Sequence, residues 1–337
     1  MKLSIVVPCY NEEAVLPETT RRLGLLLDAL GASGRISPDS EVVFVDDGSR
    51  DATWSLIEAA GARDARFGGI KLSRNRGHQN ALLAGVLNAD GDVIISVDAD
   101  LQDDLDAIER MLQAYHEGAE VVFGVRRRRD TDTFFKRFSA EGYYHLLNRI
   151  GVDIVFNHAD YRLLSRAAIE ALKQYGEVNM FLRGVVPQLG FKTATVLYDR
   201  AERFAGETKY PLRKMLALAF EGVTSFSATP LRLITGFGLL VSVLTFFVGL
   251  WALLARVFIP DAVVPGWAST VVPIYFLGGL QLFCMGIMGE YVSKIYGESK
   301  RRPRFLIERT TGAASYVPGL VTRRRPTPAR VDERLTA

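Results

Sequence analysis

Short apolar runs alternate with amphipathic stretches along the first 125 or so residues of the chain. The apolar runs have the length of single strands, and they fall at residues 3–7, 42–45, 69–72, 93–97 and 121–123. The stretches between them have the apolar spacing of helices that cover a sheet. This rhythm predicts a doubly wound α/β fold with a buried, mostly parallel sheet.

The C-terminal part contains two long apolar segments, at residues 233–258 and 271–295. At about 1.5 Å per residue, each exceeds the roughly 30 Å hydrocarbon core of a bilayer, so we predict a hairpin of two transmembrane helices. Residues 259–270 contain no Lys or Arg, whereas basic residues flank both outer ends, which places both ends in the cytoplasm. Gln281 and Glu290 are costly in hydrocarbon and should face a partner helix or the lipid headgroups, which favours a homo-oligomer of unspecified size.

These patterns predict four parts. They are an α/β domain at 1–210, a juxtamembrane amphipathic helix at 211–230, the two transmembrane helices within 231–296, and a basic, disordered cytoplasmic tail at 297–337. Residues 134–150 interleave aromatic and basic side chains, which is typical either of a helix in the membrane interface or of a core helix on the sheet.

The overall composition says little about function, but the positions of the charged residues along the chain are informative. The net charge is only +3, but Lys and Arg gather beside the apolar C-terminal part, as expected at a membrane surface. Cys9 and Cys284 suggest no disulfide framework, and the apolar run at the N-terminus is too short for a signal peptide. The basic run at 126–129 is compatible with nucleic acid, but no nucleic-acid module accompanies it, so we expect no such partner.

Asp98, Asp100 and Gln102 directly follow the apolar run at 93–97. Open parallel sheets bind ligands outside the carboxyl ends of their strands, and Mg²⁺ takes one or two carboxylates together with substrate phosphates. This cluster therefore indicates a divalent cation, Mg²⁺ or Mn²⁺, and a diphosphate ligand. The alternative is that these acids cap the helix that starts near Asp103.

Two further strand ends carry polar groups. Tyr10, Asn11 and Glu12 follow the first strand, and Asp46 ends the second, before Gly48 allows a tight turn. Each set is compatible with simple helix capping, but acidic ends of three strands that converge on one sheet edge favour a site for a nucleobase and ribose.

An anionic lipid headgroup would need cations near the membrane, and Arg suits bidentate contact with phosphate. The candidates for binding such a phosphate headgroup are Arg126, Arg137, Arg203, Lys209 and Arg213.

Five motifs occur in one order. They are Pro8-x-Tyr10-Asn11-Glu12, Val45-Asp46-Asp47-Gly48-Ser49, Arg74-Asn75-x-Gly77, Asp98-Ala99-Asp100-Leu101-Gln102 and Gly206-Glu207-Thr208-Lys209-Tyr210-Pro211. With the two apolar segments, they resemble the GT-A fold, family 2 glycosyltransferases that act on polyisoprenyl phosphates, which include bactoprenol glucosyltransferases and dolichol-phosphate mannose synthases. The resemblance covers roughly residues 1–300.

The resemblance implies three sets of site residues. The nucleotide would be contacted by Pro8, Tyr10, Asn11, Glu12, Asp46 and Asp98. The metal would be contacted by Asp98, Asp100 and Gln102. The catalytic residues would be Asp160 and Asp100.

From the residues alone, Asp160 is a loop acid that pairs with Arg162 before a helix opened by Ser165. The resemblance makes it the catalytic carboxylate instead. A phosphate monoester with a second pKa near 6 is already largely anionic at pH 7, so we expect Asp160 to position the acceptor or support positive charge rather than remove a proton. The four histidines have no metal-ligand spacing and are interpreted as structural, with His158 as the first candidate exception.

The resulting expectation is a metal-dependent, inverting transfer of one sugar from a nucleotide diphosphate sugar, with UDP-glucose as the default donor. The acceptor is polyprenyl (undecaprenyl) phosphate at the cytoplasmic face of a bacterial inner membrane. One alternative is a processive polysaccharide synthase, although the Gln-x-x-Arg-Trp motif of those enzymes does not occur here. The other is a catalytically silent membrane adaptor with the same fold.

Overall fold

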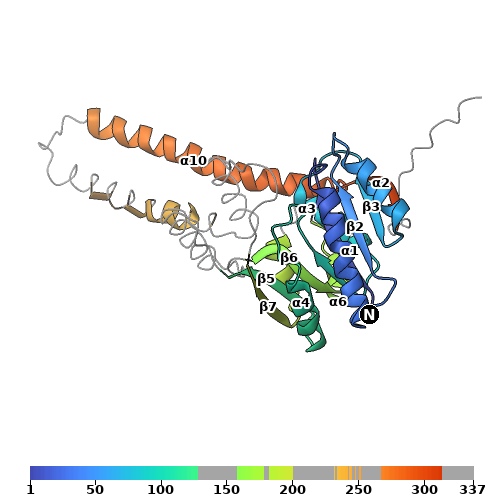
Figure 1. The fold of residues 1–337 in the computed structure, drawn as a ribbon. Helices are drawn as coiled ribbons and strands as arrows, with labels where there is room; N and C mark the ends of the chain where they lie inside the picture. The colour runs from blue at the N-terminus through green and yellow to red at the C-terminus, as the bar shows by residue number, and fades with distance from the viewer. Residues whose placement is uncertain are drawn as a thin grey trace, which may run out of the picture. The chain divides into compact units, whose positions relative to one another are not determined.

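The structure is a computed structural model, and it describes residues 1–127, 158–177, 182–199, 231, 234–241, 243–244, 247, 250–251 and 267–312. The chain divides into two compact units, which are described separately (Figure 1). The first comprises Met1–Asp132, Val155–Thr208 and Pro303–Ala337, and the second comprises Thr133–Ile154 and Lys209–Arg302.

The first unit is built on one eight-stranded sheet of order β7-β5-β6-β4-β1-β2-β3-β8. β1 pairs in parallel with β2 and β4, β2 with β3, and β5 with β7, whereas β6 and β8 are antiparallel to their neighbours. The prediction of an α/β domain with a mostly parallel sheet is therefore confirmed. The strands are β1 (Leu3–Cys9), β2 (Glu41–Asp46), β3 (Phe67–Leu72), β4 (Val93–Ser96), β5 (Val121–Arg126), β6 (His158–Ser165), β7 (Thr193–Tyr198) and β8 (Ile307–Gly312).

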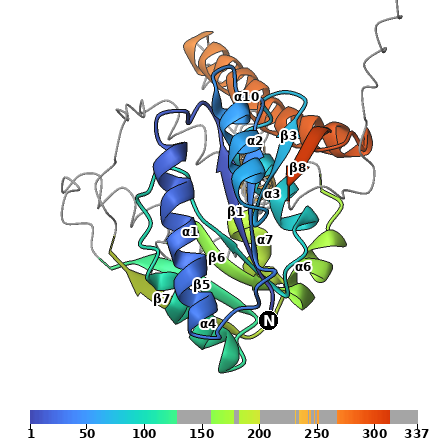
Figure 2. The same ribbon diagram turned by 45° about the vertical axis from the view of Figure 1, so that its right-hand side comes forward.

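Helices cover both faces of this sheet (Figure 2). Alternate residues of a strand point to opposite faces. Leu3, Ile5 and Val7 of β1 join a buried apolar cluster with side chains of α1, α2 and α4, whereas Val6 lies against α3. The helices of this unit are α1 (Leu16–Ala32), α2 (Thr53–Arg63), α3 (His78–Asn88), α4 (Ala107–His116), α6 (Arg166–Lys173) and α7 (Leu182–Gln188).

Helix α3 approaches the sheet closely because it presents Gly85 to β1 and β2. A Cβ atom at this position would lie 2.3 Å from a methyl carbon of Val6 and 2.8 Å from one of Val45. Both valines are buried in the sheet and cannot easily move away. This small residue therefore sets the height of α3 above the sheet, and with it the position of the residues at the start of the helix.

The last described segment differs from the disordered tail that we predicted from residue 297 onward. Residues Ile307–Gly312 form β8, which pairs antiparallel with β3, and the side chain of Ile307 is buried. The main chain of Ser73 also donates a hydrogen bond to the carbonyl of Leu306 at 2.9 Å. The prediction was wrong for this segment because its partner strand lies more than two hundred residues earlier in the sequence. Residues 313–337 lie outside the described residues.

The second unit contains α10 (Trp267–Ser299), which includes the whole of the second predicted membrane segment at 271–295. Large apolar side chains are exposed along it, among them Ile274, Phe276, Leu282, Phe283 and Met285. Within the described part of the chain, no helix meets both the length and the apolar character that a membrane span requires. Half of the predicted segment at 233–258 falls outside the described residues, as do the whole of the predicted amphipathic helix at 211–230 and of the helix at 134–150. The two spans stay predictions.

The close approach of α3 gives a stability prediction. Gly85→Ala should lower the free energy of unfolding by about 1–3 kcal/mol, because the added methyl group overpacks the contact with Val6 and Val45. Chemical denaturation of the full chain in detergent measures the change. Gly31→Ala, in α1 with open space around the Cβ position, is the control and should be neutral or slightly stabilising. Equal effects of the two substitutions would contradict the proposed contact.

Candidate active site

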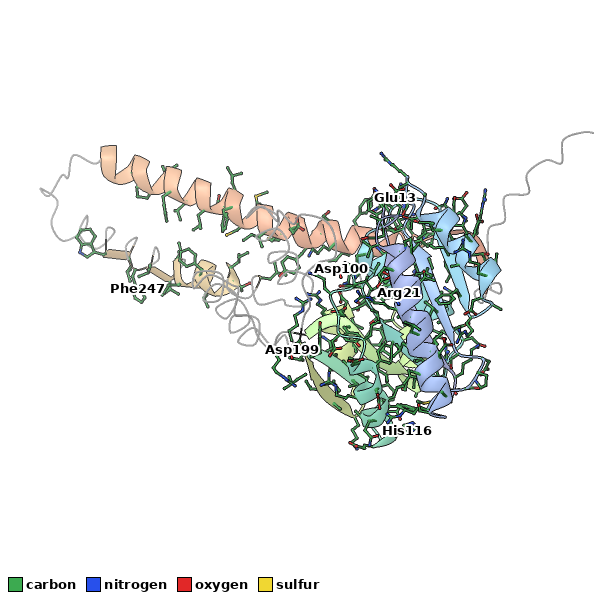
Figure 3. All side chains as sticks on the ribbon, viewed as in Figure 1. Glu13, Arg21, Asp100, His116, Asp199 and Phe247 are labelled. Atoms are coloured by element: carbon green, nitrogen blue, oxygen red, sulfur yellow. The ribbon has the colours of Figure 1, made fainter. Side chains whose placement is uncertain are left out.

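The carboxyl ends of β4, β1 and β2 lie side by side in the sheet and carry most of the predicted site residues. Tyr10 follows β1, Asp46 ends β2, and Asp98 comes two residues after β4. Figure 3 shows Glu13 and Asp100 at this end of the domain and His116 at the other. The strand order therefore brings together the groups that the sequence places at separate strand ends.

Asp46 lies at a corner that suits a nucleotide. Its side chain is fully buried; Oδ1 accepts the main-chain N–H of Ser49 at 2.9 Å, while Oδ2 is buried without a hydrogen-bond partner in the structure. A buried acceptor left in this state favours a ligand that brings an N–H or O–H donor, such as a nucleobase or ribose. Tyr10, which directly follows β1, is 42% exposed, whereas Pro8 is buried inside the strand.

Asn11 and Glu12 link the turn after β1 to the turn after β2. Asn11 has a positive φ of 55°, its N–H donates to Ser49 Oγ, and its Oδ1 accepts the N–H of Arg50, each at 2.9 Å. The N–H of Glu12 donates to Thr53 Oγ1 at 2.9 Å. Asn11 thus holds the turn after β1 against the turn after β2, beside Asp46.

Asp47 connects this corner to α3. Its Oδ1 accepts the N–H of Arg76 at 2.7 Å, and its Oδ2 accepts the N–H of Gly77 at 2.8 Å. Gly48 has a φ of +70°, and a Cβ there would lie 2.7 Å from main-chain atoms of the segment 74–75. Gly77 also has a positive φ, 86°, immediately before the helix. The turn after β2 therefore holds the segment that begins α3.

The predicted metal ligands lie on the loop after β4. Leu101 has a positive φ of 58°, which turns the loop sharply, and Asp100 Oδ1 accepts the N–H of Gln102 at 3.2 Å. Burial, together with the negative charge of Asp103, raises the pKa of Asp98 to about 6. Gln102 is buried. Among the described residues, no group of three or more His, Cys, Asp or Glu side chains is arranged to hold a metal ion by itself.

Two carboxylates nevertheless fit a cation that takes its remaining ligands from phosphate and water. Burial first and the charge of Asp103 second raise the pKa of Asp98, and a divalent cation bound there would offset both effects. The oxygen donors of Asp98 and Asp100 are the hard type that Mg²⁺ and Mn²⁺ prefer.

Asp160 lies within strand β6, between β4 and β5, and is only 7% exposed, so the expectation of a loop acid was wrong. The Nη2 atom of Arg162 lies 2.6 Å from its Oδ1, as the pairing expected from the sequence requires. Arg183 on α7 adds two hydrogen bonds, from Nε to Oδ1 at 3.2 Å and from Nη2 to Oδ2 at 3.0 Å. Burial alone would raise the pKa of Asp160, but the nearby imidazole of His78 and the charges of both arginines hold it well below its usual value.

His78 stands between the two acidic groups. Its Nε2 lies 3.6 Å from Asp98 Oδ1 and 3.6 Å from Asp160 Oδ2. Burial opposes its protonation, but the nearby carboxylates of Asp160 and Asp98 outweigh burial and raise the pKa of His78. We expected His158 to be the exceptional histidine; its side chain lies outside the described residues, and the structure places His78 at the site.

The structure describes one of the five predicted phosphate-binding cations. Arg126 ends β5 and donates from Nε to the hydroxyl oxygen of Tyr198 at 3.3 Å. Arg137, Arg203, Lys209 and Arg213 lie outside the described residues. Sequence reasoning missed His78, Gln79 and Arg183, although a Gly-His-Gln segment at a helix start after a strand was a usable signal for the first two.

The chain is similar to several known proteins. The sequence model for "Glycosyl transferase family 2" matches residues 4–173. The chain is 50% identical to the uncharacterized glycosyltransferase YkoT of Bacillus subtilis, over 91% of each chain. It is 41% identical to the prophage bactoprenol glucosyl transferase homolog of Escherichia coli, over 92% of this chain and 99% of that one. A solved mannosyl-3-phosphoglycerate synthase from Rubrobacter xylanophilus is 17% identical, covers 69% of this chain and 74% of its own, and has a TM-score of 0.46.

The contacts of Asp47 predict that this carboxylate orders the start of α3. Asp47→Asn keeps the shape but replaces one acceptor oxygen with an N–H donor facing a main-chain N–H, which should cost about 1–3 kcal/mol locally. Hydrogen exchange of the peptide 74–80 should become faster. Asp28→Asn, which removes a surface contact with Arg66, is the control and should leave that peptide unchanged. Unchanged protection in the Asp47 variant would contradict this role.

Proposed function

Because this chain belongs to glycosyltransferase family 2, we propose that it transfers a single sugar from a nucleotide diphosphate donor to polyprenyl phosphate, with inversion and with a divalent cation. UDP-glucose is the default donor and undecaprenyl phosphate the default acceptor. The observation that carries this proposal is the alignment of Asp46, Asp98 and Asp160 along one edge of the sheet. That the chain is a glycosyltransferase follows from its family; the donor and acceptor are the proposal.

The relatives support the choice of donor and acceptor. The Escherichia coli chain is named as a bactoprenol glucosyl transferase homolog, and this chain matches nearly its whole length. A relationship of this extent makes a lipid phosphate acceptor and a glucosyl donor the first to test.

Asp98 and Asp100 are proposed to hold the cation together with the donor diphosphate, with Gln102 nearby on the same loop. A divalent cation bound there would neutralise the charge that develops on the departing diphosphate. Asp46 and Tyr10 would hold the base and ribose, which places the sugar toward Asp160.

Asp160 is proposed to act as a fixed negative charge and positioning group. A carboxylate whose pKa is held well below its usual value is a poor proton acceptor. The acceptor phosphate is already largely anionic at neutral pH and needs no general base. Asp160 can instead stabilise positive charge at the anomeric carbon while the acceptor oxygen attacks the face opposite the nucleotide, which inverts the configuration.

Attachment to the bacterial inner membrane is part of the proposal, with the α/β domain and the C-terminus on the cytoplasmic side. The support is the two long apolar segments, the basic residues that flank them, and the exposed apolar side chains of α10, several of them over 60% exposed. A homo-oligomer would shelter Gln281 and Glu290 of the second segment. A processive synthase and a silent adaptor are disfavoured, because the processive acceptor motif does not occur in the sequence and Asp98, Asp100 and Asp160 are all present.

The proposed function is tested with membranes that contain the chain, labelled UDP- and GDP-sugars, and polyprenyl phosphate, with and without Mg²⁺ or Mn²⁺. We expect label in the lipid fraction only with the cation. Asp98→Asn and Asp100→Asn should lower transfer by about 100-fold or more and weaken Mn²⁺ binding, because each removes a charged ligand. Asp160→Asn should lower transfer comparably while Mn²⁺ binding persists.

The matched control is Asp106→Asn, which changes an exposed acid on the segment that leads into α4 and should leave transfer unchanged. No lipid labelling from any donor by the folded native chain would reject the proposed function. Full transfer by the Asp98 and Asp100 variants would reject the metal site alone.

The topology is tested by labelling introduced cysteines with a membrane-impermeant maleimide in a Cys284→Ala background, in which the remaining Cys9 is buried. Asp261→Cys, between the two predicted spans, should react in intact cells, whereas Glu58→Cys, exposed on α2, should react only after lysis. The opposite pattern would overturn the predicted hairpin.

A further inference from the structure

Gln79 belongs to the cluster around Asp160, but only one end of its side chain is used. The residue is the second of α3, and its Nε2 donates a hydrogen bond to Asp160 Oδ2 at 3.0 Å. Its Oε1 is buried and has no hydrogen-bond partner in the structure. The NH₂ group of the Gln79 amide therefore has a hydrogen-bond partner, the carboxylate of Asp160, whereas the amide oxygen has none.

The orientation of this amide follows from the charges around it. Arg162 and Arg183 donate hydrogen bonds to both oxygens of Asp160, so the carboxylate is ionised and can only accept. If the amide of Gln79 were turned over, its oxygen would face the oxygen of Asp160, and both would lack a proton to share. The NH₂ group must therefore face Asp160, which leaves Oε1 as the orphaned atom.

A buried carbonyl oxygen needs a donor, and the parts of the proposed reaction differ in what they offer. The diphosphate of the donor and the ionised phosphate of the acceptor present only acceptor oxygens. The base and ribose belong at the corner formed by Asp46, after a different strand. The sugar that is transferred carries several hydroxyl groups, and it must lie near Asp160 when the bond forms.

We propose that Gln79 is a specificity-determining residue, whose Oε1 accepts a hydrogen bond from one hydroxyl group of the transferred sugar while its Nε2 stays on Asp160. The inference rests on the proposed function and deepens it. A sugar whose hydroxyl group can reach Oε1 satisfies the last hydrogen-bonding atom of the Gln79 amide. The same amide hydrogen-bonds the carboxylate of Asp160 through Nε2. A sugar without that hydroxyl leaves a buried acceptor unsatisfied and is disfavoured.

The test compares the native full-length chain with Gln79→Met, which has a similar length but no hydrogen-bonding amide. UDP-glucose, UDP-N-acetylglucosamine and GDP-mannose are first screened for transfer to polyprenyl phosphate. The donor that works is then compared with its monodeoxy analogues. In the native chain, one analogue should lose about 3- to 10-fold in kcat/KM, as expected for one hydrogen bond between uncharged groups. The Met variant should use that analogue and the parent sugar equally.

Gln113→Met, at a site where the amide only contacts Glu117 on the surface of α4, is the matched control and should keep the native pattern. If Gln79→Met does not fold, Gln79→Ala serves for the same comparison. An equal loss for every donor would mean that Gln79 only positions Asp160, and a loss of Mn²⁺ affinity in the presence of UDP would mean that Oε1 binds the ion; either result overturns the inference. If the native chain transfers no donor at all, the proposed function fails and the inference with it.

Discussion

A negative charge buried in a protein must be matched by positive charge and hydrogen bonds, and Asp160 imposes this requirement on the first unit. Leaving such a charge unmatched costs about 3–5 kcal/mol. Arg162 can meet it because residues two apart in a strand share a face. Arg183 and Gln79 come from α7 and α3, so three elements converge on one carboxyl group. The Nε atom of Arg162 is buried without a partner, which suggests that this cluster is not optimised for stability alone.

The two acids on either side of His78 have opposite electrostatic environments. Burial and, after it, the negative charge of Asp103 raise the pKa of Asp98 to about 6, so its surroundings favour the binding of a cation. Asp160 is already matched by two arginines, which hold its pKa low. Two carboxyl groups in one site can have different roles when their surroundings shift their pKa values in opposite directions. Here one acid is suited to hold an ion and the other to keep a permanent charge.

The parts of the fold that could be predicted from the sequence are those set by neighbouring residues. The apolar runs marked strands, and the polar residues after them marked the active edge, because a parallel sheet aligns these ends whatever the loops do. Strand β6 was missed because Asp160 and Arg162 interrupt its apolar residues, so it lacks the continuous apolar run that marked the other strands. For the same reason Asp160 was expected in a loop. Gln79 and Arg183 reach Asp160 across 81 and 23 residues of sequence, a distance that no local pattern encodes.

The return of the chain to β8 bears on how the catalytic domain can be isolated. A fragment cut before α10 would lack the outermost strand of the sheet, and the main-chain groups of β3 that face it would be left open to solvent. Open strand edges of this kind recruit other chains and promote aggregation. A catalytic fragment would therefore be better made by keeping residues 303–312 than by simple truncation, with a linker long enough to cross the sheet, because β7 and β8 are its two opposite outer strands.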